Sequence, residues 1–199
     1  RMKMELDVNR LRTEGVDQAR RIAELLEMEY HFHPSFTVEE EQYGNAILSL
    51  MPLRVVRAAA LPRLGNSEPR GAIWVNLSCN GRRVSLFNTH LGLRPDERTA
   101  QIHALMGPDW LGKADAGTPA IICGDLNAVP GSSVYRALAQ KFCDAQLARR
   151  RRAATWMRLL CYDYVFTTPD FEVVRTLVPR THLTVVASDH LPVIVDLEL

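Results

Sequence analysis

Runs of apolar residues separated by turn residues recur along the chain and predict β-strands. They lie at residues 45–50, 71–79, 82–90, 120–123, 162–168, 171–178 and 191–199. The run at 120–123 is apolar at every position, which is typical of a strand covered on both faces. Asn80 and Gly81 separate two of the runs, and this dipeptide is a strong signal for a hairpin turn.

Three segments have the features of helices. Residues 15–30 place small and apolar side chains on one face and charged side chains on the other. Residues 94–110 carry acids in their first turn and close with a Gly-Pro pair. Ser132 or Ser133 is a natural N-cap for a third helix that runs to Lys141. Few helices among hairpin-joined strands predict an α/β (α+β) fold of two mixed sheets with helices outside, rather than a doubly wound sheet.

Composition changes this prediction little. At 199 residues, with 47% hydrophobic and 24% charged residues, the chain is expected to form a single domain, residues 1–199, with a substantial core. Its net charge of +1 provides no general attraction to polyanions. The 4 cysteines are scattered, so a reducing, cytoplasmic location is expected. The sequence contains no apolar segment long enough for a membrane span, and neither a dinucleotide-binding nor a P-loop glycine motif.

Small polar residues stand at the ends of several predicted strands. Asp125 and Asn127 follow the run at 120–123 and are two positions apart, so in an extended chain they point to the same side. The others are Asn88 with His90, Asp163, and Asp189 with His190. Each alone has an ordinary explanation as a turn residue, a cap or a core histidine. Together they favour a functional site, because sites in such folds collect at strand ends.

The residue types at these strand ends indicate the chemistry. Carboxylates and amides are the ligands that a hard divalent cation prefers, and histidines suit proton transfer and phosphate contact. Zinc is disfavoured because the sequence lacks histidine and cysteine residues at zinc-ligand spacing.

Four segments resemble, in order, the motifs of the endonuclease/exonuclease/phosphatase superfamily. They are residues 88–92, 124–132, 163–166 and 188–193. The resemblance covers nearly the whole chain. It implies the deoxyribonuclease I-like fold, a four-layer sandwich of two mixed β-sheets flanked by helices, with the site at one mouth of the sheets. It also implies hydrolysis of a phosphoester that depends on Mg²⁺ or Mn²⁺.

The resemblance assigns metal binding to two acids. Glu5 matches the family's metal-binding glutamate, although Met4 stands where the family usually has glutamine. Asp189 matches a second acidic ligand, or a contact to metal-bound water. Asn88 is a candidate for a supporting contact or a phosphate contact.

The resemblance assigns catalytic roles to five further residues. Asp163 resembles the acid that orients His190, which in turn handles the attacking water or the phosphate. Asp125 resembles the residue that aligns or deprotonates the nucleophile, and Asn127 holds both it and a phosphoryl oxygen. His90 resembles the histidine that contacts the phosphate or assists the leaving group.

The chain departs from the family pattern in two places. The family's first strand, with its asparagine motif, has no counterpart before Glu5, so we expect the natural N-terminus and one site asparagine to be missing. The segment from Arg149 to Cys161 is short, and Cys161 stands near a position where arginine is common. Since the other motifs are intact, missing pieces are favoured over a degenerate protein.

Two classes of function follow. The first is a metal-dependent phosphodiesterase or phosphatase, and the near-neutral charge favours a small-molecule or lipid head-group substrate over nucleic acid. A DNA or RNA endonuclease or exonuclease is the alternative within that class. The second is an inactive binding module, which is disfavoured because the acids and histidines of the motifs are retained. The sequence indicates no obligate protein partner and no transmembrane segment.

Three other features have ordinary interpretations. His31 and His33 could bind a metal, but an exposed loop before Pro34 is favoured. The arginine run at 149–152 suits a solvated loop better than a nucleic-acid contact. Trp156 could pack on a substrate or cover the core.

Overall fold

The computed structural model describes residues 5–114, 117–148, 153–157 and 159–199. Its strands are β1 (Glu5–Val8), β2 (Glu29–Val38), β3 (Glu41–Ser49), β4 (Arg54–Ala60), β5 (Gly71–Cys79), β6 (Arg82–His90), β7 (Ala120–Asp125), β8 (Cys143–Asp144), β9 (Asp163–Thr167), β10 (Glu172–Leu177) and β11 (Ile194–Glu198). Its α-helices are α1 (Gln18–Leu26), α2 (Pro95–Met106), α3 (Ser133–Ala139) and α4 (His182–Ala187), with short 3-10 helices η1 (Leu11–Thr13) and η2 (Ala145–Ala148).

The largest sheet contains six strands in the order β4-β5-β6-β7-β9-β8. It is mixed, because β6 and β7 are parallel while β7 and β9 are antiparallel. β5 and β6 form the predicted hairpin, and its turn residues Asn80 and Gly81 have φ values of 51° and 76°. Both residues therefore adopt the left-handed backbone that a tight two-residue hairpin requires.

A second layer of strands faces the six-stranded sheet. It consists of a three-stranded antiparallel unit, β1-β3-β2, and the antiparallel pair β10-β11. Ile47 of β3 packs in one apolar cluster with Ile73, Leu86 and Cys123 of the large sheet, and Val195 of β11 borders this cluster. Burial of these side chains holds the two layers together.

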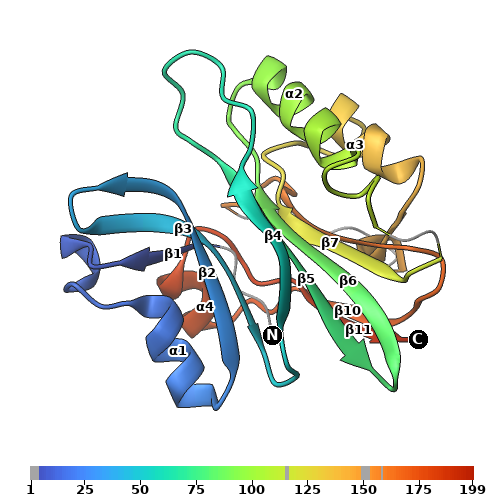
Figure 1. Ribbon diagram of the computed structural model, residues 1–199, viewed down its shortest axis with the longest axis horizontal. Coiled ribbons are helices and arrows are strands. Elements are labelled where there is room, and N and C mark those ends of the chain that lie inside the picture. Colours follow the sequence, from blue (N-terminus) through green and yellow to red (C-terminus); the bar gives the residue numbers. More distant parts are fainter. Residues whose placement is uncertain (1–4, 115–116, 149–152, 158) are drawn as a thin grey trace.

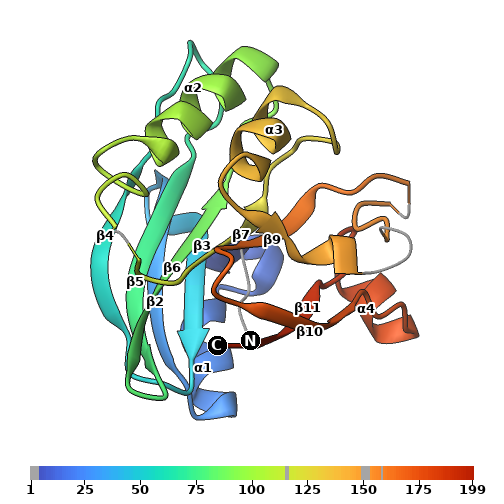
Figure 2. The same cartoon turned by 90° about the vertical axis from the view of Figure 1, so that its right-hand side faces the viewer.

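Helices cover the outer faces of both layers (Figures 1 and 2). Ile102 of α2 and Leu138 of α3 pack with Trp74 and Phe87 on the outer face of the large sheet. On the opposite side of the molecule, α1 packs its small residues against β1 and β3, in a cluster of Ala19, Ala23, Leu6, Ala46 and Leu48. This is the four-layer sandwich that the sequence predicts.

The structure differs from the sequence predictions in β2. His31 and His33 lie within this strand and are half-buried, so the prediction of an exposed loop is wrong. The strand continues past Pro34 because β2 is an edge strand, where a missing N–H is tolerated, and its register shifts between Pro34 and Phe36.

One helix is not predicted, and another is shorter than predicted. Residues 182–187 form α4, which the pattern does not predict; its capping box joins Thr181 and Thr184. Helix α3 ends at Ala139 rather than at Lys141, and its N-cap is Ser132.

The arginine run at 149–152 lies outside the described residues. Among the helices that the structure describes, none is long and apolar enough to cross a membrane.

Candidate active site

Three neighbouring strands bring polar side chains to one edge of the six-stranded sheet. His90 is the last residue of β6, Asp125 is the last residue of β7, and Asp163 is the first residue of β9. The register aligns His90 with Asp125, and Asp125 with Asp163, so the three residues form a row across the sheet. Because β9 runs opposite to β7, its beginning meets the ends of the other two strands.

Gly124 allows β7 to approach β6 closely beside this row. Its φ is 154°, and a Cβ atom at this position would lie 1.9 Å from the carbonyl oxygen of Thr89. A side chain here would push the end of β7 away from β6 and displace Asp125. The glycine that precedes Asp125 in the sequence is therefore needed to build the row.

The side chain of Asn127 lies against the row formed by His90, Asp125 and Asp163. Its backbone N–H donates to Asp125 Oδ1 at 2.7 Å, and its φ of 46° lies in the left-handed region that asparagine tolerates. Its side-chain Nδ2 donates to the Leu91 carbonyl at 2.9 Å and lies 2.8 Å from His90 Nε2. Asp125 and Asn127 thus form a local turn and also contribute side chains to the site.

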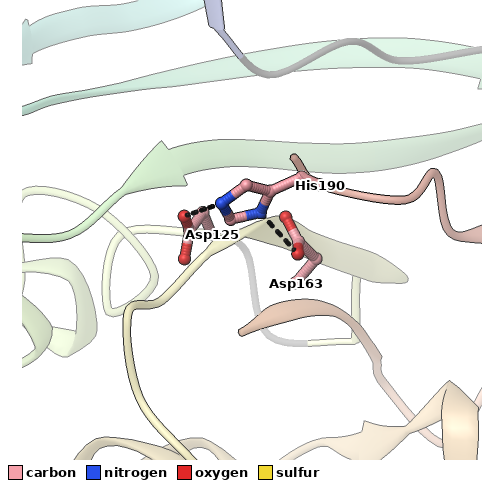
Figure 3. A group of neighbouring side chains, drawn as sticks. All are labelled: Asp125, Asp163 and His190. Carbon is pink, nitrogen blue, oxygen red and sulfur yellow. Dashed lines mark hydrogen bonds and ion pairs between the residues drawn. The ribbon is translucent and has the colours of Figure 1, made fainter. Parts of the chain in front are cut away.

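His190 enters the site from the segment between α4 and β11, and its ring lies between two carboxylates (Figure 3). Its Nδ1 is 2.9 Å from Asp163 Oδ2, and its Nε2 is 3.7 Å from Asp125 Oδ2. Burial alone would lower the pKa of His190, but the hydrogen bond to Asp163 and the neighbouring carboxylates raise it above its ordinary value. The surroundings of His190 therefore favour the charged imidazolium.

Asp125 stands at the centre of the row. Burial and the negative charge of Asp163 raise the pKa of Asp125 to about 7, although the N–H of Asn127 and the positive charges of His190 and Arg70 act in the opposite direction. A carboxyl group with a pKa near neutrality can both accept and release a proton under ordinary conditions.

His90 has different surroundings from His190. Its Nε2 lies 3.6 Å from Asp125 Oδ2, and its Nδ1 lies 3.1 Å from Nη1 of Arg70. Burial, together with the charge of His190, lowers the pKa of His90 to about 3. His90 is therefore a neutral imidazole at neutral pH.

Arg70 belongs to the site, but the sequence motifs do not point to it. It immediately precedes β5, is 5% exposed, and donates from Nη2 to Glu68 at 3.1 Å. The hairpin register pairs Ala72 with Thr89, so Arg70 lies at the same end of the sheet as His90. A sequence signal for Arg70 does exist. It is a single arginine directly before an apolar strand, at a position that the hairpin turn places opposite the end of β6.

Three predicted residues stand outside the row. Asn88 is 0% exposed and donates to the carbonyl of Ala46 at 2.9 Å, so it joins β6 to β3 beneath the site. This position favours the supporting contact over the phosphate contact, because the side chain of Asn88 is buried between the layers. Asp189 is exposed and directly precedes His190. Glu5 begins β1, and its side chain lies outside the described part of the structure.

The donor set at this edge fits a hard divalent cation. One ligand atom from each of Asp125, Asp163 and His190 lies within 4.8 Å of the others. Burial, and after it the negative charge of Asp163, raises the pKa of Asp125, and a cation beside these carboxylates would favour their charged forms. Oxygen donors predominate here, which suits Mg²⁺ or Mn²⁺ better than zinc.

A four-layer sandwich with acids, an amide and histidines at one sheet edge is the architecture of the deoxyribonuclease I-like phosphoester hydrolases. Residues 7–190 match the Endonuclease/Exonuclease/phosphatase family, and the chain belongs to this family.

Individual proteins and solved structures are similar to this chain. The uncharacterized protein YbhP of Escherichia coli (strain K12) is 25% identical over 188 residues, which cover 89% of this chain and 72% of that protein. The human Nocturnin catalytic domain with bound sulfate anion is 25% identical, with a TM-score of 0.74 over 92% of this chain and 76% of that chain. The mannosyl-6-phosphatase Bt3783 of Bacteroides thetaiotaomicron VPI-5482 shares the fold at 19% identity, with a TM-score of 0.72 over 92% and 81% of the two chains.

Proposed function

We propose that the chain carries the active site of a divalent-metal-dependent phosphodiesterase or phosphatase that uses an activated water. The observation that carries this proposal is the position of His190, with Nδ1 2.9 Å from Asp163 and Nε2 3.7 Å from Asp125. A half-buried imidazole between two carboxylates, which raise its pKa, is poorly explained by core packing. It is well suited to stabilising the negative charge of a phosphoryl group and moving a proton beside it.

In the proposed reaction, water attacks phosphorus in line with the bond to the leaving oxygen. The new P–O bond forms while the old one breaks, and the leaving oxygen takes the electron pair of the broken bond. Asp125 accepts the proton that the water loses, which its pKa of about 7 allows. Asp163 keeps the Nδ1 proton of His190 in place, so that Nε2 faces Asp125 and the reacting phosphate.

Glu5 and Asp189 are the residues that would hold Mg²⁺ or Mn²⁺ in this proposal. When bound, the cation would supply positive charge to the phosphoryl and leaving oxygens. Asp125, Asp163 and His190 also lie close enough together to hold a cation, but Asp163 and His190 hydrogen-bond each other, so this proposal gives those two a supporting role instead.

The proposed substrates are small phosphoesters or lipid head groups. The net charge of +1 favours them over a long polyanion, which usually meets a basic groove. Among structures with this fold, one is described as a mannosyl-6-phosphatase and another, ANGEL2, as a 2',3'-cyclic phosphatase. Hydrolysis of DNA or RNA is the alternative.

A substrate panel tests the proposal. The full chain is incubated with bis- and mono-nitrophenyl phosphate, phospholipids and supercoiled plasmid, each with Mg²⁺, Mn²⁺ or a chelator. We expect metal-dependent hydrolysis of the small or lipid esters and its loss in chelator. Plasmid nicking alone would select the nuclease function, and hydrolysis that persists after exhaustive chelation would refute the metal dependence.

A further inference from the structure

The two ring nitrogens of His90 both face nitrogen atoms that carry hydrogens. Nη1 of Arg70 lies 3.1 Å from Nδ1, and Nδ2 of Asn127 lies 2.8 Å from Nε2. A neutral imidazole has one N–H and one acceptor nitrogen, so it can accept from only one of these two neighbours. The neighbour that prevails therefore determines where the ring carries its proton.

Arg70 has the less adaptable chemistry of the two neighbours. A guanidinium has only donors and stays charged, so the nitrogen that faces it must be the acceptor. The side-chain amide of Asn127 offers both a donor and an acceptor, and the two ends exchange places when the amide turns. When the amide turns, Oδ1 can accept from an N–H on His90 Nε2, and the hydrogen bond from Nδ2 to the Leu91 carbonyl, 2.9 Å long, is given up.

Arg70 is held in place by contacts from other parts of the molecule. It is 5% exposed, and its Nη2 donates to Glu68 at 3.1 Å. The positive charge of Arg70 also acts on Tyr43 of β3, whose hydroxyl stays protonated because burial raises the pKa of Tyr43 to about 12. A buried guanidinium that is also bound to Glu68 cannot easily turn away from His90.

We propose that Arg70 is a positioning residue that fixes His90 as the tautomer with its proton on Nε2. This inference rests on the proposed function of the site, which it deepens. The Nε2–H of His90 then faces the side-chain amide of Asn127, and Asp125 Oδ2 lies beside it, 3.6 Å from His90 Nε2 and 3.7 Å from His190 Nε2. His90 thus serves as a neutral hydrogen-bond donor to a phosphoryl oxygen, while proton transfer belongs to Asp125 and His190.

The experiment reads the tautomer directly. Two-bond and three-bond ¹H–¹⁵N correlation spectra of histidine-labelled full chain distinguish a proton on Nε2 from one on Nδ1, with His90→Gln used to assign the signal. We expect the Nε2–H form in the unmodified protein and in Arg70→Lys, which retains a charged donor. In Arg70→Met, we expect a substantial population with the proton on Nδ1, because Asn127 can then donate to Nε2.

Turnover is measured on the same preparations with the substrate that the panel identifies. We expect Arg70→Met to lower kcat by about tenfold or more, with partial recovery in Arg70→Lys, since loss of an orienting partner of a histidine has effects of this order. Arg54→Met, which changes an exposed arginine at the start of β4, is the matched control and should resemble the unmodified protein. A proton on Nδ1 in the unmodified protein, an unchanged tautomer in Arg70→Met, or unchanged kcat in that variant would each overturn the inference.

The tautomer of the unmodified protein separates this inference from the proposed function. It requires no turnover and no variant, so it remains decisive if Arg70→Met fails to fold. An Nε2–H signal in a protein that hydrolyses none of the panel would support the role of Arg70 and refute the hydrolase. A metal-dependent hydrolase with an Nδ1–H signal would do the reverse.

Discussion

His90 and His190 flank the same carboxylate, Asp125, but their surroundings have opposite electrostatic character. His90 faces the N–H groups of Arg70 and Asn127, and burial lowers its pKa to about 3. His190 faces carboxylates, which raise its pKa above its ordinary value despite burial. The two histidines, to which the sequence resemblance assigns separate catalytic roles, are thus suited to different tasks. One is a neutral donor, and the other is a charged donor that can transfer a proton.

Substitution of His190 should have the largest effect. His190→Ala removes the charged ring between Asp163 and Asp125, so we expect turnover to fall by about 10²- to 10⁴-fold, as loss of a general acid or base does. The ring is half-buried rather than part of the core, so the melting temperature should change little. Specific activity and melting temperature are measured on one preparation.

The control for this prediction is His103→Ala, which changes an exposed histidine on α2. It should leave both measurements unchanged. A folded His190→Ala protein with near-normal turnover would end the assignment of His190 and remove the functional contrast between the two histidines.

Asp163→Asn should have a smaller effect on turnover than His190→Ala. The amide can still occupy the space beside His190 Nδ1, but it lacks the negative charge that helps to raise the pKa of His190. We expect a loss of about 10- to 100-fold, which is the range for an outer partner of a functional histidine. A loss equal to that of His190→Ala would mean that Asp163 acts directly on the reacting group.

Much of the difference between the surroundings of His90 and His190 cannot be predicted from the sequence. The strand ends at His90, Asp125 and Asp163 follow from apolar runs bounded by polar residues, and a parallel neighbour then brings two of them together. The position of Arg70 depends on hairpin register and on contacts with Tyr43 and Glu68, which no local pattern encodes.

Asn88 is a second position whose surroundings local sequence pattern does not predict. It stands two residues before His90 on the same strand, so alternation places both side chains on one face of the sheet. Whether that face is open or covered depends on how β3 packs there, and the carbonyl of Ala46 covers Asn88. Alternation predicts the face, and only the packing of the second layer distinguishes a buried amide from a site residue. Pairing with β3 likewise carries β2 through His31 and His33, where local pattern predicts a loop.

Gly124→Ala tests whether the close spacing of β6 and β7 is needed to place Asp125 between His90 and His190. A Cβ atom at Gly124 would meet the carbonyl oxygen of Thr89 at 1.9 Å, so β7 must shift and carry Asp125 away from both histidines. We expect a loss of about 2 kcal/mol or more in the free energy of unfolding, together with reduced turnover. Urea unfolding and specific activity provide the two measurements.

Gly131→Ala is the matched control for this variant. Gly131 has a φ of 82°, but a Cβ atom added there would meet no neighbouring atom within 4 Å, so the variant isolates backbone strain from steric clash. It should cost about 1 kcal/mol and leave turnover per folded molecule unchanged. Equal losses of stability in the two variants would mean that the close approach of β7 to β6 is unimportant.

The smallest expected effect tests the electrostatic contrast itself, through the pH dependence of stability in a chelating buffer. His90 has a folded-state pKa of about 3, below its ordinary value of 6.5, so below about pH 6.5 the unfolded chain binds a proton that the folded protein does not. Its contribution to stability is present above that pH and is lost as the pH falls. His190 has a raised folded-state pKa, so its contribution is present in acid and is lost as the pH rises through that value.

Substitution of the two histidines should therefore change the difference in stability between about pH 8 and about pH 5.5 in opposite directions, by about 1 kcal/mol for His90. His90→Gln should reduce the loss in acid, whereas His190→Gln should increase it. His31 and His33 also have pKa values lowered by burial, so every variant should retain some acid sensitivity, and the comparison rests on differences between variants. His103→Gln is the control for an exposed histidine. Changes of the same sign in His90→Gln and His190→Gln would show that the two rings share one electrostatic environment, because only opposite shifts of the folded-state pKa produce opposite slopes.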